Sequence, residues 1–207
     1  MSNSGHDGAT RTGRLTPAEI LAAAIELLDE VGLPDLSMRR LAAKLDSQPS
    51  GLYWHFENKQ TLLAKISDVI VEHTIAVEAP ATPWQAQTMS SAMAFADSLL
   101  AFRDGAEVVS STLALGLGAS KALERIRQPM LAGGVPADIA GATAESILFM
   151  VLGQVWHRQQ RMAADSLGVT SAAASTTPEQ LATGASAQPI ETGVGLILAG
   201  LSQRLVV

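Results

Sequence analysis

The sequence predicts an all-α protein, and three observations lead to this expectation. Of the 207 residues, 47% are hydrophobic but only eight are aromatic, which is few for a sheet-rich core. Apolar residues recur at the three- and four-residue spacing of helices, in segments that begin near proline and end near glycine. Strand-like alternation of useful length is missing from the sequence. Length and hydrophobic content suffice for one large domain or two small ones with a buried core.

Charge and cysteine content restrict what this protein can do. The formal net charge is −6, so any contact with nucleic acid must rest on a local patch rather than on bulk charge. The chain has no cysteine, which excludes disulfides, thiolate zinc sites and cysteine nucleophiles. The first ten residues lack the apolar core of a signal peptide, and no stretch reaches the roughly 18 consecutive apolar residues of a membrane span. We therefore expect a soluble, cytoplasmic protein without a membrane partner.

The first predicted helix follows a polar, aperiodic N-terminal segment. We expect residues 1–15 to form a flexible arm. The helix begins after Thr16, where Thr-Pro-Ala-Glu combines an N-cap threonine, a proline at the first helical position and Glu19 reaching back to the cap. Apolar residues recur at helical spacing until Gly32, a residue type that commonly ends helices.

Two short helices and a longer one come next. Ser37 is placed to cap a helix with a basic outward face. The residues of that face are Arg39, Arg40 and Lys44. A third helix is predicted over Pro49–His55, and a longer apolar-periodic run extends over Lys59–Val77. We place a domain boundary near residue 60, with a smaller helical domain at residues 16–60 and a larger one at residues 61–207.

The rest of the chain is predicted to form helices separated by proline and glycine. Thr82-Pro83-Trp84-Gln85 has the pattern of a capping box at the start of a helix. Glycines break the middle of the chain into shorter helices, and another helix follows Pro136 to about Gln160. Residues 163–190 are rich in Ala, Ser and Thr, and we expect a mobile loop there. A last, glycine-containing helix is predicted over Glu191–Leu205.

The two short helices have the spacing of a helix-turn-helix. In that motif the N-terminal end of the second helix enters the DNA major groove. Here this end combines an amide that can pair with adenine, a small hydroxyl and a glycine that permits close approach, and aromatic and basic groups follow it. The DNA-contacting residues that this geometry predicts are Gln48, Pro49, Ser50, Gly51, Tyr53, Trp54, His55 and Lys59. The alternative for any one of them is an ordinary solvated helix face.

Two runs of residues around these helices have a specific pattern. They are Leu36-Ser37-Met38-Arg39-Arg40-Leu41-Ala42 and Gly51-Leu52-Tyr53-Trp54-His55-Phe56-Glu57-Asn58-Lys59, the second followed by Leu62-Leu63. The stretch that contains them, Thr16–Val71, resembles the DNA-binding domain of the tetracycline-repressor family. The resemblance implies that residues 16–60 form a three-helix helix-turn-helix DNA-binding domain and that residues 61–207 form a C-terminal helical effector-binding, or ligand-binding, and dimerisation domain. It also implies a homodimer. By position, the resemblance implies DNA contacts at Ser37, Arg39, Gln48, Pro49, Ser50, Gly51, Tyr53, His55 and Lys59, which adds Ser37 and Arg39 to the predicted set. The turn departs from the family pattern, since Asp46 and Ser47 stand where a glycine and an apolar residue are usual.

Two further sites are predicted in the C-terminal domain. A stripe of methionine, aromatic and polar residues suits a cavity for apolar effectors, and a plain core is the alternative. The residues of this stripe are Met89, Met93, Phe102, Met150, Gln154 and His157. Apolar faces on the helix after Pro136 and on the last helix suit a four-helix dimer interface, and an intrachain core is the alternative. The residues of these faces are Leu148, Leu152, Val155, Val194, Ile197 and Leu201. Metal-ligand spacings and cofactor motifs are missing from the sequence, so we expect neither a metal nor a cofactor.

Together, these patterns and the family resemblance imply a ligand-responsive transcriptional regulator. We expect a repressor that binds pseudo-palindromic double-stranded operator DNA as a homodimer and is released by a small hydrophobic or drug-like effector. Release would follow a population shift, with the helix over Lys59–Val77 as the lever. An all-α enzyme is disfavoured, because the sequence has no nucleophile elbow, phosphate loop or metal spacing. A helical small-molecule-binding protein without operator binding stays open, because Asp46 departs from the family's turn pattern and the basicity is low.

Overall fold

The computed structural model describes residues 15–73, 82–166 and 188–205, and every regular element in these ranges is a helix. This confirms the predicted all-α class. The helices are α1 (Pro17–Val31), α2 (Met38–Lys44), α3 (Pro49–Tyr53), α4 (Lys59–Glu72), α5 (Trp84–Leu100), α6 (Gly105–Ala114), α7 (Ser120–Ala132), α8 (Ala137–Ser166) and α10 (Gln188–Leu205).

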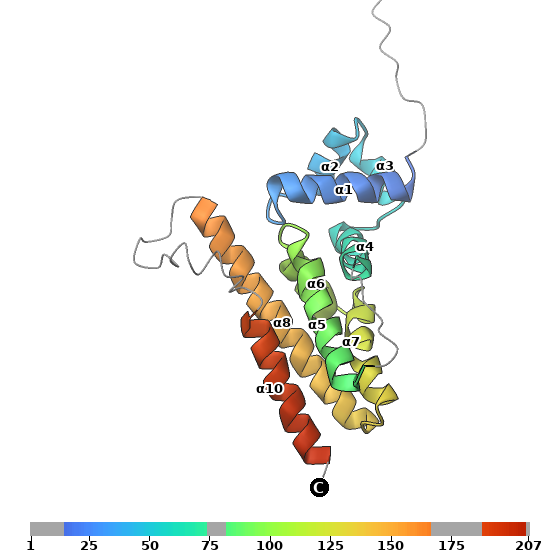
Figure 1. Cartoon of the computed structure of the whole chain (residues 1–207). Coiled ribbons are helices and arrows are strands. Elements are labelled where there is room, and N and C mark those ends of the chain that lie inside the picture. The colour runs from blue at the N-terminus through green and yellow to red at the C-terminus, as the bar shows by residue number, and fades with distance from the viewer. Residues whose placement is uncertain (1–14, 74–81, 167–187, 206–207) are drawn as a thin grey trace, which may run out of the picture.

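The N-terminal unit consists of α1, the short helix α2, which packs against α1, and the short helix α3, which packs against α2 (Figure 1). The predicted start of α1 is confirmed, because Thr16 and Glu19 form a reciprocal capping box. The predicted end is also confirmed, since Gly32 follows the helix with a φ of 78°. Leu41 from α2 and Leu52 from α3 are fully buried in the same core as α1. Short helices of this length are marginal alone, so this shared core holds them in place.

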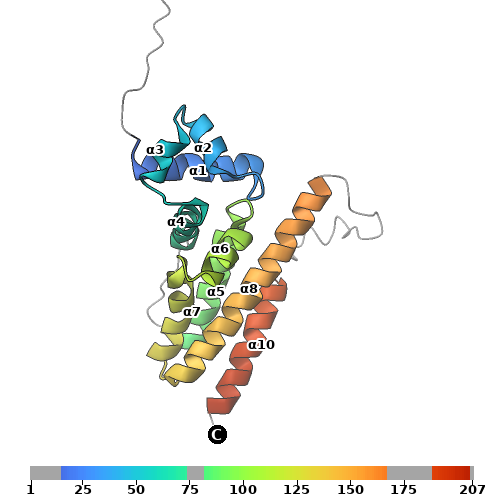
Figure 2. The ribbon, with the colours of Figure 1, turned by 180° about the vertical axis from the view of Figure 1, so that it is seen from behind.

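The C-terminal unit is a bundle of α5, α6, α7, α8 and α10. In two opposite views, α8 and α10 lie side by side along one flank, and α7 lies on the other (Figures 1 and 2). Helix α4 lies between the two units and contacts α1 on one side and α5, α6 and α7 on the other. Its buried residues Leu62, Ile66 and Ile70 join the two cores into one continuous cluster. A movement of α4 therefore has to involve both units.

Helix α8 is long and apolar enough, by length and composition, to cross a membrane. Its apolar residues instead form the centre of the bundle, because Ala144, Ile147 and Val151 are fully buried. The helix contacts α5, α6, α7 and α10. It is a core helix rather than a membrane span.

Some predicted element boundaries differ from the structure. Helix α3 ends at Tyr53 rather than His55. Residues 163–166 continue α8, and residues 188–190 already belong to α10, so the predicted loop is shorter at both ends. The remainder of that loop, the N-terminal arm up to residue 14 and the part of the Lys59–Val77 run beyond His73 lie outside the described residues.

The predicted capping box at Thr82–Gln85 is a further difference. Helix α5 begins at Trp84, one residue later than the pattern suggests, so the N-cap is Pro83, which makes no side-chain cap. The side chain of Gln85 instead donates to the Ser202 hydroxyl on α10, at 3.2 Å. The Gln85 amide thus bonds a residue of another helix, whereas the local pattern predicted that it would cap its own helix.

Candidate nucleic-acid interface and effector groove

The turn between α2 and α3 has helix-turn-helix geometry. Helix α2 begins after Ser37, whose hydroxyl accepts a hydrogen bond from the Arg40 amide at 3.2 Å. Asp46 adopts a left-handed conformation with a φ of 48°, the conformation for which glycine is usual. The Ser47 amide then bonds the Ala42 carbonyl at 2.9 Å. Asp46 and Ser47 are therefore accommodated in an ordered turn.

The N-terminal end and outer face of α3 carry most of the predicted DNA contacts. Gln48 and Ser50 are exposed, and Tyr53 and Trp54 are 50% and 83% exposed. Pro49, Gly51 and His55 are half-buried. A tryptophan this exposed is unusual in an isolated soluble protein and is typical of a binding surface. Buried Leu52, on the opposite face of α3, holds this surface on the core.

The predicted basic face of α2 is largely paired with acidic groups. Arg40 forms an ion pair with Asp35, at 3.3 Å. The Lys44 ammonium lies 2.7 Å from Glu30 and 3.4 Å from Glu26 on α1, and the hydrogen bond to Glu30 is the main cause that raises the pKa of Lys44. Arg39 is exposed and forms none of the ion pairs found among the described residues. Of the three, Arg39 offers the most available cation.

Lys59, the first residue of α4, is engaged inside the protein. Its ammonium donates to the Leu33 carbonyl at 3.1 Å, and partial burial lowers the pKa of Lys59 below its ordinary value. Asn58 caps the same helix end through a reciprocal bond with Thr61. Lys59 therefore anchors α4 to the segment after α1, and its role as a phosphate contact stays a prediction. The same holds for Ser37, which serves as the cap of α2.

Sequence reasoning missed the α5–α6 corner, residues 101–104, which joins the two units. The Arg103 guanidinium donates to the carbonyls of Asp29 and Glu30 near the end of α1, at 3.0 and 2.9 Å. A cation at this position also complements the helix dipole of α1. The Asp104 carboxylate accepts the Leu33 amide at 2.7 Å. Arg-Asp-Gly at a predicted helix break was the only sequence signal for this contact.

Gln159 of α8 holds the same corner from the other side. Its amide nitrogen donates to the carbonyls of Leu99 and Phe102, at 3.1 and 2.9 Å, and its oxygen accepts the Ala106 amide at 3.2 Å. Gly105 is required here, because a Cβ would lie 2.4 Å from the Leu99 carbonyl oxygen. A continuous polar path therefore runs from α8 through the corner to α1.

The turn between α6 and α7 makes a second connection, to α4. The Asp68 carboxylate on α4 accepts the Ala119 amide at 3.0 Å. Gly118 has a φ of 87°, and a Cβ there would lie 2.7 Å from the Ala64 carbonyl oxygen. Beyond this turn, Arg125 donates to the Val71 carbonyl and Lys121 pairs with Glu72. Helix α4 is thus tied to the bundle along much of its length.

Of the six residues predicted for an effector cavity, four pack against the core and two lie nearer the surface. Met150 lies against Gly193, where a Cβ would come within 2.7 Å of its sulfur, and Met89 lies beside Gly195. Both methionines, with Met93 and Phe102, pack against the core. Phe102 makes an edge-on ring contact with His73, at 5.6 Å between centroids. Gln154 is half-buried and His157 is exposed. These placements match the alternative of a plain core for the apolar members.

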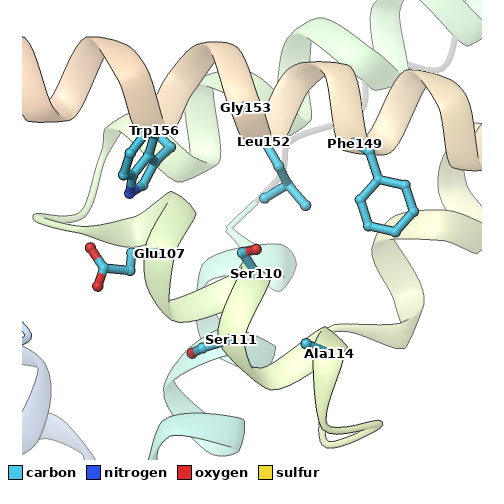
Figure 3. Close-up of a pocket in the computed structure, with 8 residues that line it drawn as sticks. All are labelled: Glu107, Ser110, Ser111, Ala114, Phe149, Leu152, Gly153 and Trp156. Carbon is cyan, nitrogen blue, oxygen red and sulfur yellow. The ribbon is translucent and has the colours of Figure 1, made fainter.

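A groove of about 430 Å³ lies between α6 and α8 (Figure 3). It is lined by Glu107, Ser110, Ser111, Ala114, Phe149, Leu152, Gly153 and Trp156. None of these residues was predicted as an effector contact. The α6 segment carries no sequence motif, and only long-range packing determines which α8 residues lie beside it. Within the described ranges, no three histidine or carboxylate side chains lie close enough to hold a metal ion.

The residues predicted for the dimer interface are mostly buried within one chain. Five of them are at most 6% exposed, namely Leu148, Leu152, Val155, Val194 and Leu201, and Ile197 is half-buried. Side chains already covered by their own chain leave little surface for a partner. The large apolar residues exposed on these helices are others: Phe149, Trp156 and Met162 on α8, 61%, 46% and 58% exposed, and Leu196 and Leu205 on α10, 70% and 39% exposed.

Comparison with known proteins accounts for nearly the whole described chain. Residues 20–66 match "Bacterial regulatory proteins, tetR family", and residues 78–205 match "Tetracyclin repressor-like, C-terminal domain". The class C tetracycline repressor protein of Escherichia coli is 31% identical over 202 residues, or 92% of each chain. For the class A repressor of transposon 1721 from Escherichia coli, 38% identical, the match spans 48% of this chain and 47% of that protein.

Solved structures agree with this assignment over the full fold. BioQ crystallised with its natural double-stranded DNA operator has a TM-score of 0.72 and 32% identity, covering 90% of this chain and 98% of that one. A single-residue variant of TetR from Acinetobacter baumannii AYE, in complex with minocycline, has a TM-score of 0.72 and 26% identity, covering 91% and 97%. The chain therefore belongs to the tetR family of bacterial regulatory proteins, as an all-α transcriptional regulator with an N-terminal helix-turn-helix and a C-terminal helical domain.

Proposed function

We propose that this protein is a repressor that binds pseudo-palindromic operator DNA as a homodimer and releases it when a small molecule binds the C-terminal domain. The observation that carries the proposal is the exposed end of α3, where Gln48, Ser50, Tyr53 and Trp54 project from a rigid helix-turn-helix. The solved relative BioQ holds its operator, and a second relative holds minocycline. A DNA-binding regulator also fits a soluble, cytoplasmic location, and membership in a family of regulators disfavours the enzyme alternative.

In this proposal, base readout and phosphate contact are divided among different residues. The amide of Gln48 can pair bidentately with adenine, and Ser50 can bond either base edge. Arg39, Tyr53 and Trp54 are suited to the sugar-phosphate backbone, which fixes the register but carries no direct sequence information. Low basicity elsewhere limits general attraction to DNA.

Replacing Arg39 with alanine is expected to weaken operator binding by about tenfold and to lower the slope of log affinity against log salt by about one. Arg40→Ala is the matched control, because Arg40 already pairs with Asp35. It is expected to change affinity by less than about threefold. The measurement is fluorescence anisotropy with duplexes from the DNA upstream of the protein's own gene. Equal effects of the two substitutions would contradict the assignment, and no binding to any duplex at low salt would favour the small-molecule-binding alternative.

Dimerisation in this proposal uses the outward faces of α8 and α10. Phe149, Gly153 and Trp156 follow one another along α8 at helical spacing, and Leu196 is exposed on α10. Gly153, which is exposed between the two aromatic residues, permits close approach of a second copy. The helix-turn-helix lies at the far end of the molecule from the end of α10 (Figure 1). A twofold axis along this flank would place the α3 helices of both subunits at the same end of the dimer, where both could contact one DNA duplex.

Leu196→Glu is expected to convert the dimer into a monomer, because a desolvated, unpaired carboxylate at an apolar contact costs several kcal/mol. Trp54→Glu is the control, since it introduces the same charge at a more exposed residue in the DNA-binding unit. It is expected to remain dimeric while losing operator binding. Mass by light scattering during size-exclusion chromatography distinguishes the two. A dimeric Leu196→Glu protein would place the interface elsewhere.

Effector release requires a coupling between the bundle and the DNA-binding unit. Two connections are available, one through α4 and the α6–α7 turn, and one from Gln159 through the α5–α6 corner to α1. An effector that prefers the non-operator conformation by about 3 kcal/mol lowers operator affinity by roughly two orders of magnitude. Substitutions of the residues that form either connection are expected to change this coupling, although these residues do not contact DNA.

A further inference from the structure

We propose that the α6–α8 groove binds an organic cation with an apolar body, as the effector of the regulator proposed above. The regulatory role of the ligand rests on the proposed function. The site and the ligand class are argued from the residues that line the groove. The groove has one charged group, two exposed aromatic rings and a volume in the range of small-molecule sites.

The two walls of the groove place charge and apolar surface at opposite ends. Glu107 of α6 lies opposite Trp156 of α8, and Ala114 lies opposite Phe149 (Figure 3). Seven residues of helix separate the two ends on each wall, which corresponds to about 10 Å. A ligand that lies along the groove therefore meets a carboxylate and an indole at one end and a phenyl ring at the other.

Glu107 provides the electrostatic preference. Its side chain is half-buried in the first turn of α6, and it takes part in none of the hydrogen bonds or ion pairs found among the described residues. Every other lining residue is uncharged. A carboxylate in a partly desolvated groove favours a cation and repels an anion more strongly than one in bulk water. The face of Trp156 adds a cation–π contact to the same end.

The remaining lining selects for an apolar body. Phe149, Leu152 and Ala114 offer hydrocarbon, and Gly153 has no side chain to narrow the groove. The Ser111 hydroxyl is already bonded to the Val108 carbonyl, at 2.9 Å. Ser110 is exposed and leaves one hydroxyl for a polar group of the ligand. The fitting ligand is thus a monocation with aromatic or alkyl groups and few hydrogen-bonding atoms.

The proposed dimer would close the open side of this groove. Phe149, Gly153 and Trp156 line the groove and also belong to the outward face of α8 that the dimer uses. A second subunit across that face would shield the ligand from water, which strengthens both the ionic and the cation–π contact. The occupant proposed here is the cation. Filling of the groove by the partner's side chains is a competing outcome that the experiment detects as a lack of binding.

Tetraphenylphosphonium and tetraphenylborate test the ligand class, because they have nearly the same shape and opposite charge. By isothermal titration calorimetry on the full chain, tetraphenylphosphonium is expected to bind at least about tenfold more tightly. Glu107→Gln is expected to remove most of that preference. Glu145→Gln, an equal charge change at an exposed α8 residue outside the groove, is expected to keep it. Equal binding of the two ions, equal effects of the two substitutions, or no binding would overturn the proposal.

Operator binding measured on the same samples separates this inference from the proposed function. Tetraphenylphosphonium is expected to release operator DNA from the wild-type protein at concentrations that saturate the groove. A protein that binds operator but not the cation contradicts the groove assignment alone. A protein that binds the cation through Glu107 but ignores every duplex contradicts the proposed repressor function and leaves the site intact.

Discussion

Replacing Gly118 with alanine is expected to lower the free energy of unfolding by about 3 kcal/mol. Two costs add at this position. The φ of 87° is unfavourable for any residue with a Cβ, and that Cβ would lie 2.7 Å from the Ala64 carbonyl oxygen and 2.8 Å from the Ser67 hydroxyl. Because Ala64 contributes backbone in the middle of α4, the clash cannot be relieved by a rotamer change. The α6–α7 turn would have to move away from α4.

Gly116→Ala is the matched control for this substitution. Gly116 lies in the same turn and has a φ of 68°, but a Cβ there meets nothing within 4 Å. Gly116→Ala is expected to lower the free energy of unfolding by only about 1 kcal/mol, the cost of a positive φ for a residue with a Cβ. Urea denaturation of both variants measures the difference. Equal losses would show that the close approach of this turn to α4 contributes nothing to stability.

Gln159→Ala is the second substitution with a large expected effect, a loss of about 3 kcal/mol in unfolding free energy. It removes three hydrogen bonds and leaves the carbonyls of Leu99 and Phe102 and the amide of Ala106 without these partners. Gln160→Ala changes the same residue type on the next, exposed position of α8. That control is expected to stay within about 0.5 kcal/mol of the wild-type protein.

Operator affinity provides a second measurement for the Gln159 variant. The α5–α6 corner that Gln159 supports also carries Arg103 and Asp104, which bond the end of α1. A loosened corner is expected to weaken operator binding by about tenfold, although Gln159 belongs to the bundle and not to the DNA-binding unit. Unchanged affinity in a folded Gln159→Ala protein would show that this path does not couple the two units.

The amino-acid sequence by itself determined the all-α class and the helix-turn-helix. Thr16, Gly32 and Pro49 act on their immediate neighbours, through caps, a left-handed φ and a restricted first turn, so these helix ends could be predicted locally. Gln48 and Trp54 are exposed, as residues predicted to contact DNA must be. The end of α3 and the start of α5 were less predictable, because packing shifts a helix end by one or two residues.

Only the tertiary structure decided which residues build the groove, the corner and the anchored start of α4. Gln159 and Leu99 are 60 positions apart, and Lys59 and Leu33 are 26 apart, so no local pattern connects them. Periodicity places Leu152 or Met150 on the apolar side of a helix, but it cannot tell whether the covering surface comes from the same chain or from a partner. That choice depends on how long-range packing arranges the helices, and α8 meets four of them.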